Sequence, residues 1–356
     1  MIENISIKET ATVKDVLQKM DETLRRLLIV VDEDEEFVSL VSLGDIQRYL
    51  ISHQDFKASL DKVLRKEITV ATSHHSNQEI EAMMLKFRTE FMPVLNDEGK
   101  LEKVVYWEDF FGEQQPLQKG ALNLPVVIMA GGKGTRLRPI THIIPKPLIP
   151  VGEKPIMQII VEQFVGAGCK DFFFSVGYKA NMLKAYFDDI EDKLYNITYY
   201  SETKPMGTAG SLSLIKDQID KTFFVSNCDI IIEQDYNEIY EYHKSNNNEL
   251  TAVAFVKNMK IPYGTFEVKQ DGLLESLVEK PEFTFLVNAG LYILEPHLLE
   301  EIPGDEFFHI THLMENVMKR NGRIGVFPIN EGAWLDIGQW KEYQKTLRKY
   351  GEEIQF

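Results

Sequence analysis

An internal repeat constrains the first third of this chain more than any other feature. When the chain is aligned with itself at an offset of 64 residues, residues 12–16 fall on 76–80, 28–32 on 92–96, and 41–46 on 105–110, without a gap. Each copy predicts a helix, an apolar strand, an acidic turn, a second strand, and a helix that opens at an aspartate, Asp45 or Asp109. Residues 1–115 therefore predict a pair of small α/β repeats.

Composition sets the class of protein and the compartment. The chain has 356 residues, of which 44% are hydrophobic and 26% charged, as in ordinary globular proteins. Two cysteines, Cys169 and Cys228, are too few for a disulfide scaffold or a four-thiolate zinc site, and they suit a reducing compartment. The chain shows no secretory signal and no apolar run of the roughly 18 residues that a membrane span needs, so we expect a cytoplasmic protein.

The charge balance argues against nucleic acid as a partner. The formal net charge is −16, divided into −9 for residues 1–115 and −7 for residues 116–356. Both parts would repel a phosphate backbone, and the acidic excess serves solubility. Any phosphate-binding site must therefore be a local basic cluster within an acidic protein.

The hydrophobic pattern changes after a polar segment that contains Pro116 and Gly120, which we interpret as a linker over residues 116–123. Beyond it, strands are predicted at 126–130, 171–176, 197–201 and 222–226, and helices at 156–164 and 180–187. This alternation predicts a doubly wound α/β domain over residues 124–356. Sites in such sheets lie just beyond the strand ends, here at Gly131, from Glu202 onward, and from Asn227 onward.

A glycine-rich, cationic loop follows the first of these strands. Residues 131–141 read Gly-Gly-Lys-Gly-Thr-Arg-Leu-Arg-Pro-Ile-Thr, and Lys146 follows shortly. Glycines let backbone N–H groups approach phosphate, and Lys133, Arg136, Arg138 and Lys146 would neutralise a triphosphate. The string lacks the pattern of a Walker A loop and the third glycine of the dinucleotide fingerprint.

The repeat pair resembles tandem cystathionine β-synthase (CBS) domains over roughly residues 1–112. The resemblance implies a regulatory nucleotide held by Ser42 and Asp45 in the first copy. The second copy keeps Asp109 but has Tyr106 in place of the hydroxyl residue. Alternatively, both aspartates are helix caps and the pair is a folding or dimerisation module.

Residues 124–346 resemble the nucleotidyltransferases that join nucleoside triphosphates to sugar 1-phosphates. The shared motifs are the glycine-rich loop with its Lys-Pro-Leu element, Gly-Thr-Ala-Gly at 207–210, Asp229 at a strand end, Glu-Lys-Pro at 279–281, Asn-Ala-Gly at 288–290 and Trp-Leu-Asp at 334–336. The resemblance implies a Rossmann-like, mostly parallel sheet. It also implies nucleotide contacts at Gly131, Gly132, Gly134, Thr135 and Gly207, catalytic roles for Arg136, Lys146 and Asp229, Mg²⁺ at Asp229 and Asp336, and sugar-phosphate contacts at Gly264, Glu279, Lys280 and Asn288.

In the implied reaction, the sugar 1-phosphate oxygen attacks the α-phosphorus and pyrophosphate leaves. The string at 146–156 is more similar to guanylyltransferases, and the CBS-plus-transferase arrangement is similar to glucosamine-1-phosphate guanylyltransferases of legionaminic acid synthesis. We therefore expect GTP and glucosamine 1-phosphate. The alternatives are a mannose- or heptose-1-phosphate guanylyltransferase, or a hexose-1-phosphate transferase that uses UTP, CTP or dTTP. A catalytically silent nucleotide sensor and an oligomerising adaptor are further alternatives; we expect a homo-oligomer that binds no membrane.

Overall fold

The computed structural model describes residues 2–65, 67–87, 89–111, 122–304 and 306–351. The chain divides into two compact units. The first comprises residues 1–116, 256–287 and 330–332, and the second comprises 117–255, 288–329 and 333–356. Two long strands, β14 (Leu250–Lys260) and β17 (Glu282–Leu294), belong in part to each unit. Most of the predicted linker lies outside the described residues, and the domain limits at 115 and 124 stay a prediction.

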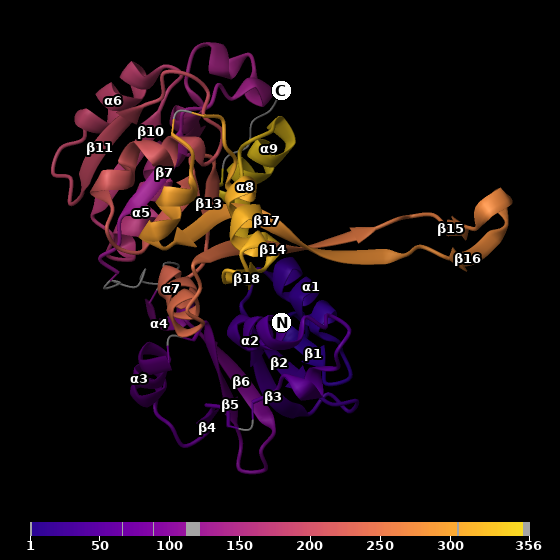
Figure 1. Ribbon diagram of the computed structural model, residues 1–356. Helices are drawn as coiled ribbons and strands as arrows, with labels where there is room; N and C mark the ends of the chain where they lie inside the picture. Colours follow the sequence, from indigo (N-terminus) through magenta and orange to yellow (C-terminus); the bar gives the residue numbers. More distant parts are fainter. Residues whose placement is uncertain (1, 66, 88, 112–121, 305, 352–356) are drawn as a thin grey trace. The chain divides into compact units, whose positions relative to one another are not determined.

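The first unit contains two copies of one α/β arrangement (Figure 1). In each copy the first two strands are parallel and the second pairs with the third in antiparallel fashion. The first copy consists of β1 (Ser6–Lys8), α1 (Val13–Thr23), β2 (Leu27–Val31), β3 (Phe37–Ser42) and α2 (Leu43–His53). The second consists of β4 (Ala71–Thr72), α3 (Asn77–Phe87), β5 (Phe91–Leu95), β6 (Leu101–Tyr106) and α4 (Glu108–Phe111).

Small structural details recur at the same offset of 64 residues. The register between the antiparallel strands shifts between Val30 and Val31 in the first copy and between Val94 and Leu95 in the second. In the turns, the side chain of Asp32 accepts two backbone N–H groups, and the side chain of Asn96 does the same. The predicted repeat is thus confirmed down to its bulges and turns.

Apolar residues of both copies form a shared core. Ile29 and Val31 from β2 and Phe91 from β5 are buried in one cluster with Ile5. Fully burying such side chains stabilises a fold by about 1.5–3 kcal/mol each. Neither short sheet could supply this burial alone, so the two copies form a single folded pair.

The second unit is built on a seven-stranded sheet (Figure 1). The strand order is β11-β10-β7-β12-β17-β14-β18. Pairing is parallel from β11 to β12 and between β14 and β18, and antiparallel between β12 and β17. The strands introduced here are β7 (Val126–Ala130), β10 (Asp171–Val176), β11 (Asn196–Ser201), β12 (Phe223–Asn227) and β18 (Ile324–Ile329). The predicted fold class, a mostly parallel α/β sheet preceded by a smaller α/β region, is confirmed.

Helices and short strands complete the molecule. The helices are α5 (Ile156–Gly166), α6 (Ala180–Asp188), α7 (Tyr236–Ser245), α8 (Ile310–Lys319) and α9 (Trp340–Lys349). The short strands form three pairs: β8 (Pro150–Val151) with β9 (Lys154–Pro155), β13 (Ile230–Ile232) with β19 (Trp334–Asp336), and β15 (Thr265–Val268) with β16 (Leu274–Val278). The predicted strands and helices between residues 126 and 226 are confirmed within two residues at each end.

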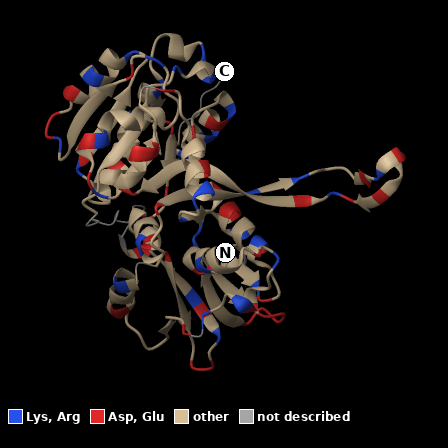
Figure 2. Cartoon of the chain, in the orientation of Figure 1, with Lys and Arg blue, Asp and Glu red and all other residues tan. Residues whose placement is uncertain are grey.

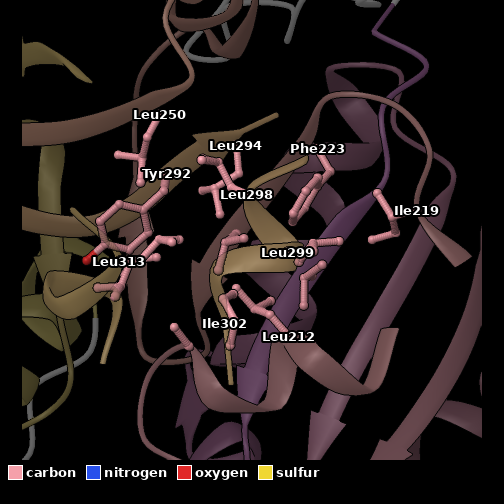
Figure 3. Packing of buried hydrophobic residues seen from close by; sticks show 14 of the residues in the cluster. Leu212, Ile219, Phe223, Leu250, Tyr292, Leu294, Leu298, Leu299, Ile302 and Leu313 are labelled. Carbon is pink, nitrogen blue, oxygen red and sulfur yellow. The ribbon is translucent and has the colours of Figure 1, made fainter. Parts of the chain in front are cut away.

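One face of the large sheet is covered by a buried apolar cluster (Figure 3). Phe223 and Tyr292 contribute to it from the sheet, and Leu298 and Leu313 pack against them from the segments that follow. None of these four side chains is more than 5% exposed. This packing fixes β12 and β17 side by side, and β12 carries the chain to the site described below.

Charged side chains of both signs are scattered over both units (Figure 2). Five consecutive acidic residues form the turn at 32–36, and three cations lie within residues 133–138 of the glycine-rich loop. Among the described residues, no helix has the length and apolar character that a membrane crossing requires.

Candidate active site

Two carboxylates from distant parts of the sequence meet beyond the end of β12. Asp229 directly precedes β13, and β13 pairs with β19 so that Ile230 lies opposite Asp336. The N–H of Ile337 donates to the carbonyl of Asp229 at 3.0 Å, which closes the end of this short ribbon. The antiparallel pairing therefore brings Asp229 and Asp336 to the same end of the ribbon.

Both carboxylates point toward one space beside Gly338. A Cβ atom at Gly338 would lie 2.8 Å from Asp336 Oδ1 and 3.3 Å from Asp229 Oδ2. The ammonium group of Lys146 forms an ion pair with Asp229, and the two side chains are only 11% and 15% exposed. The predicted residues Lys146, Asp229 and Asp336 are thus brought together by the fold.

The electrostatics of this cluster favour a further cation. Burial raises the pKa of the Asp336 carboxyl above its usual range, and the neighbouring Asp229 carboxylate raises it further. The N–H of Gly338 and the charges of Lys146 and Arg136 lower this pKa, but they do not compensate fully. A bound cation would relieve the repulsion between the two aspartates.

Asp336 does not act as a helix cap. Its Oδ1 accepts the N–H of Gly338 at 2.5 Å, and the N-cap position of α9 is Gln339, which makes no side-chain cap hydrogen bond. The adjacent Cys228 is not an alternative nucleophile, because burial raises the pKa of its thiol to about 12.

The glycine-rich loop leads from β7 toward the same cluster. The backbone of Gly134 has φ +61°, and the Thr141 hydroxyl donates to its carbonyl at 2.9 Å. A Cβ at Gly134 would lie 3.0 Å from Lys146 Cβ, so the start of the loop packs on the residue that binds Asp229. Thr135 and Arg136 lie in the single turn that follows Gly134, residues Thr135–Leu137.

The other cations of the loop are available to a ligand. Lys133, Arg136 and Arg138 have exposed side chains, and within the described part of the chain no carboxylate forms an ion pair with them. In a protein with a net charge of −16, three unpaired cations on one loop form the local basic cluster that the sequence predicted.

The predicted nucleotide loop at 206–210 is held by the segment that precedes α8. The N–H groups of Ala209 and Gly210 both donate to the carbonyl of Phe308 at 3.0 Å, and the N–H of Phe308 donates to Met206 at 2.9 Å. Gly207, with φ +79°, has room for no side chain because Phe308 O would lie 2.6 Å from its Cβ. The backbone of this loop is therefore fixed before any ligand binds.

Glu202 is a further candidate for the site, and the sequence assigned it no role of its own. It follows the last residue of β11, and its Oε1 accepts the Ser175 hydroxyl of β10 at 2.7 Å. A Cβ at Gly131 would lie 2.2 Å from the same oxygen, so the carboxylate lies directly on the glycine-rich loop. The rule that sites lie beyond strand ends pointed to this position, but the contact with Gly131 depends on the pairing of β7, β10 and β11.

The predicted sugar-phosphate residues are divided between the two units. In the second unit, the Asn288 amide donates to the Tyr292 hydroxyl at 2.8 Å and accepts the N–H of Gly290 at 3.0 Å. In the first unit, Gly264 and Glu279 face each other across the hairpin of β15 and β16, and Lys280 follows with φ +48°.

The predicted regulatory residues also have clear positions. Ser42 is the N-cap of α2, and its side chain and backbone bond reciprocally with Asp45 three residues later. Asp109 accepts the N–H of Tyr106 at 2.8 Å in the second copy. Asp45 thus completes a capping box at the start of α2, and Asp109 makes one of the corresponding bonds in the second copy.

The Asp229–Asp336 pair fits a magnesium ion. Mg²⁺ prefers one or two carboxylates and completes its shell with water and phosphate oxygens. Within the described residues there is no group of three or more histidine, cysteine or acidic side chains suited to hold a metal by themselves. Two converging carboxylates beside a cationic, glycine-rich loop match the arrangement in which a substrate supplies the remaining oxygens.

Comparison with known families gives the class of this protein. The profile described as "Nucleotidyl transferase" matches residues 125–353, and the CBS domain profile matches residues 1–52. The chain therefore belongs to the nucleotidyl transferase family and carries an N-terminal CBS domain.

Particular relatives narrow the class further. The chain is 37% identical to a mannose-1-phosphate guanyltransferase of Yarrowia lipolytica over 61% of each chain. It is 34% identical to the enzyme of that name from Saccharomyces cerevisiae over 61% of this chain and 62% of the relative. The aligned region thus spans less than two thirds of these relatives.

Solved structures give a consistent picture. HddC from Yersinia pseudotuberculosis is 28% identical and superimposes with a TM-score of 0.50 over 64% of this chain and 99% of that one. A second structure of HddC is a complex with GMP-PN. A UDP-glucose pyrophosphorylase, at 21% identity and the same TM-score over 65% and 99% of the two chains, supports the fold alone.

Proposed function

We propose that this chain transfers the guanylyl group of GTP to a sugar 1-phosphate, with release of pyrophosphate. The observation that carries this proposal is the convergence of Asp229, Asp336 and Lys146 beside a loop with free cations. Mannose 1-phosphate is the first candidate acceptor, because the relatives above bear that name. A heptose 1-phosphate is the second, and the relatives support both better than glucosamine 1-phosphate.

The residues of the second unit can perform this reaction by positioning and charge. Arg136 would hold the departing β- and γ-phosphates, and Lys146 would contact the α-phosphate and the attacking phosphate. Asp229 and Asp336 would hold Mg²⁺, which when bound neutralises charge on the phosphates. No covalent enzyme intermediate is needed, because an in-line attack on phosphorus depends on orientation and electrostatic stabilisation.

Residues of the family motifs are proposed to bind the sugar 1-phosphate. Lys280 would neutralise the phosphate of the sugar, and Glu279, Gly264 and Asn288 would bind its hydroxyl groups. These roles follow from the resemblance to the family at 263–264, 279–281 and 288–290.

Glu202 supports guanine as the base. Its carboxylate lies on Gly131, and among the described residues no lysine or arginine pairs with it. The Watson–Crick edge of guanine presents two adjacent donors, N1–H and N2–H₂, which suit a carboxylate. Uracil and thymine present one N–H donor between two carbonyl oxygens, and these oxygens are repelled by a carboxylate. A site built around such a hydrogen bond rejects bases that cannot make it.

Replacing Glu202 tests this assignment of the base. We expect Glu202→Gln to lower the ratio of kcat/KM for GTP to that for UTP by about 10-fold or more, because a carboxamide also offers a donor to uracil. Glu191→Gln, at an exposed carboxylate, is the matched control and should leave the ratio unchanged. An unaltered ratio in Glu202→Gln would show that another group reads the base.

The CBS pair is the regulatory part of this proposal. A nucleotide near Ser42 and Asp45 would change the rate if it favours one arrangement of the chain over another. We also propose that the protein acts as a homo-oligomer in the cytoplasm, where GTP and Mg²⁺ are available. A catalytically silent sensor remains the second class of function, and any turnover excludes it.

A further inference from the structure

One carboxylate of the first repeat lies where neither its helix nor its repeat requires it. Asp21 occupies the last turn of α1, where the helix ends in free carbonyl groups and a negative charge is unfavourable. The residue is half-buried, and this burial raises the pKa of its carboxyl above the usual range. At the offset of 64 residues the second repeat has Leu85 in its place. The fold of the repeat therefore does not explain Asp21.

The partners of Asp21 come from a short segment near the end of the chain. Its Oδ1 accepts the N–H of Gly332 at 3.0 Å. Burial raises the pKa of this carboxyl more than the hydrogen bonds from the N–H groups of Gly332 and Glu331 and from the side chain of Asn330 lower it. Three consecutive residues thus converge on one carboxylate.

A second side chain holds the same segment. Lys257 of β14 forms an ion pair with Glu331, and the two side chains are 41% and 24% exposed. Asp21, Lys257 and residues 330–332 all belong to the first unit. This unit therefore fixes residues 330–332 through one carboxylate and one ammonium group.

The segment continues directly into the strand that carries Asp336. That residue is the last of β19, and only three residues separate it from Gly332. Four steps along an extended chain span roughly 13 Å. The strand β19 pairs with the equally short β13 in a two-stranded ribbon, which is marginally stable by itself. The position of Asp336 therefore depends on the segments that support this ribbon, including the one that leads into it.

We infer that Asp21 is a positioning residue for the proposed reaction, because it fixes residues 330–332 and with them the start of β19. The metal-binding role of Asp336 rests on the proposed function, whereas the anchoring of β19 does not. The first unit thus supports the site of the second through the backbone that joins Gly332 to Asp336.

Hydrogen exchange of the full chain, without metal or substrate, tests the anchoring. We expect Asp21→Ala to speed exchange of the backbone amides of residues 333–337 by about 10-fold or more, because a hydrogen bond to a charged group is lost. Exchange in β2, which lies in the core of the same unit, should stay unchanged. Glu22→Ala, at the exposed neighbouring residue of α1, is the matched control.

Two further variants make the test specific. Asp21→Leu should act like Asp21→Ala, and the leucine of the second repeat shows that this position of the helix accepts it. Asp21→Asn keeps an oxygen that can accept the N–H of Gly332, so exchange in residues 333–337 should be slower than in Asp21→Ala.

Kinetics connect the anchoring to the reaction. Asp21→Ala should raise the Mg²⁺ concentration that gives half of the maximal rate by about 10-fold, as expected when a metal ligand loses its support. A role in stability alone would lower the amount of folded enzyme and leave this concentration unchanged.

Three results would overturn the inference. The first is equal exchange in residues 333–337 for Asp21→Ala, Asp21→Leu and Glu22→Ala. The second is exchange that rises as much in β2 as in residues 333–337, which would limit Asp21 to the stability of the first repeat. The third is an unchanged Mg²⁺ requirement in active Asp21→Ala. The first two need no turnover, so they are distinct from a failure of the proposed function.

Discussion

At the scale of single residues, the two aspartates of the site have different surroundings. Asp229 has a cationic partner, Lys146, whereas burial and the charge of Asp229 raise the pKa of Asp336. The same chemical change should therefore have opposite effects on stability at the two positions. Activity should fall at both, because both carboxylates are proposed to hold the metal.

Asp229→Asn should lower activity by at least about 10²-fold, comparable with the loss of one major charge partner in the transition state. It should also lower the free energy of unfolding by about 2 kcal/mol, because Lys146 loses its partner in a mostly buried position. Steady-state kinetics at saturating Mg²⁺ and urea unfolding measure the two effects. A near-normal kcat in Asp229→Asn would show that Asp229 has no part in catalysis.

Asp336→Asn should lower activity by a similar factor but raise the free energy of unfolding at pH 7 without metal. A raised pKa means that ionised Asp336 is disfavoured in the folded state. Stability is therefore lost as pH rises from the usual pKa of an aspartate through the raised folded-state pKa, and the full penalty persists at pH 7. The increase in the free energy of unfolding should shrink when the pH falls below that range. Asp189→Asn, at an exposed aspartate, is the control.

A loss of stability in Asp336→Asn at pH 7 would contradict this account of the pair. It would show that the hydrogen bond from Gly338 to Asp336, at 2.5 Å, outweighs the repulsion between the carboxylates. Asp229 and Asp336 lie close together in space, so the same substitution at each distinguishes the effect of charge repulsion on stability from the effect of hydrogen bonding.

At the scale of elements, the glycine-rich loop contains one position that suits only glycine and one at which an added Cβ would meet no neighbour. Gly134 has φ +61°, and a Cβ there would lie 2.9 Å from Thr141 Cγ2. Gly134→Ala should lower the free energy of unfolding by about 1–3 kcal/mol. Gly132→Ala is the matched control, since a Cβ at Gly132 would contact nothing within 4 Å. Equal unfolding midpoints for both variants would refute this description of the loop.

The loop and the hairpin are proposed to bind different substrates. Arg136→Ala should raise KM for the nucleoside triphosphate more than KM for the sugar 1-phosphate, because the guanidinium is assigned to the departing phosphates. Lys280→Ala should show the reverse pattern. Initial rates with each substrate varied in turn measure both constants. The same kinetic signature in both variants would contradict the division of roles.

The elements that could be predicted from the sequence are those with local signals. The strand Val126–Ala130, helix α5 and the glycine-rich loop follow from apolar runs, helical spacing and glycine. The pairing of β13 with β19 and the contact of Glu202 with Gly131 join segments distant in sequence, and no local pattern reveals them. The aspartates of the site could be named only through family motifs. The ion pairs that Arg48 and Arg65 form with Asp45 could not be predicted from the sequence at all.

At the scale of the whole molecule, an acidic chain carries a local cluster of cations in the loop of Lys133, Arg136 and Arg138, which form no ion pair within the described residues. This loop belongs to the second compact unit, which also contains Asp229, Asp336 and Lys146. Because the formal net charge of the chain is −16, such a cluster is the kind of place that suits phosphate groups. Guanylyl transfer by this unit is therefore the central claim that we make for the molecule.

Pyrophosphate release tests that claim most directly. The intact protein, with Mg²⁺, is given GTP, ATP, UTP, CTP or dTTP in combination with mannose, heptose, glucosamine or glucose 1-phosphate. The account predicts that GTP with mannose or heptose 1-phosphate gives a kcat/KM at least about 100-fold above that of the pyrimidine nucleotides. A preference for UTP or dTTP, or no pyrophosphate with any pair of substrates, would contradict it.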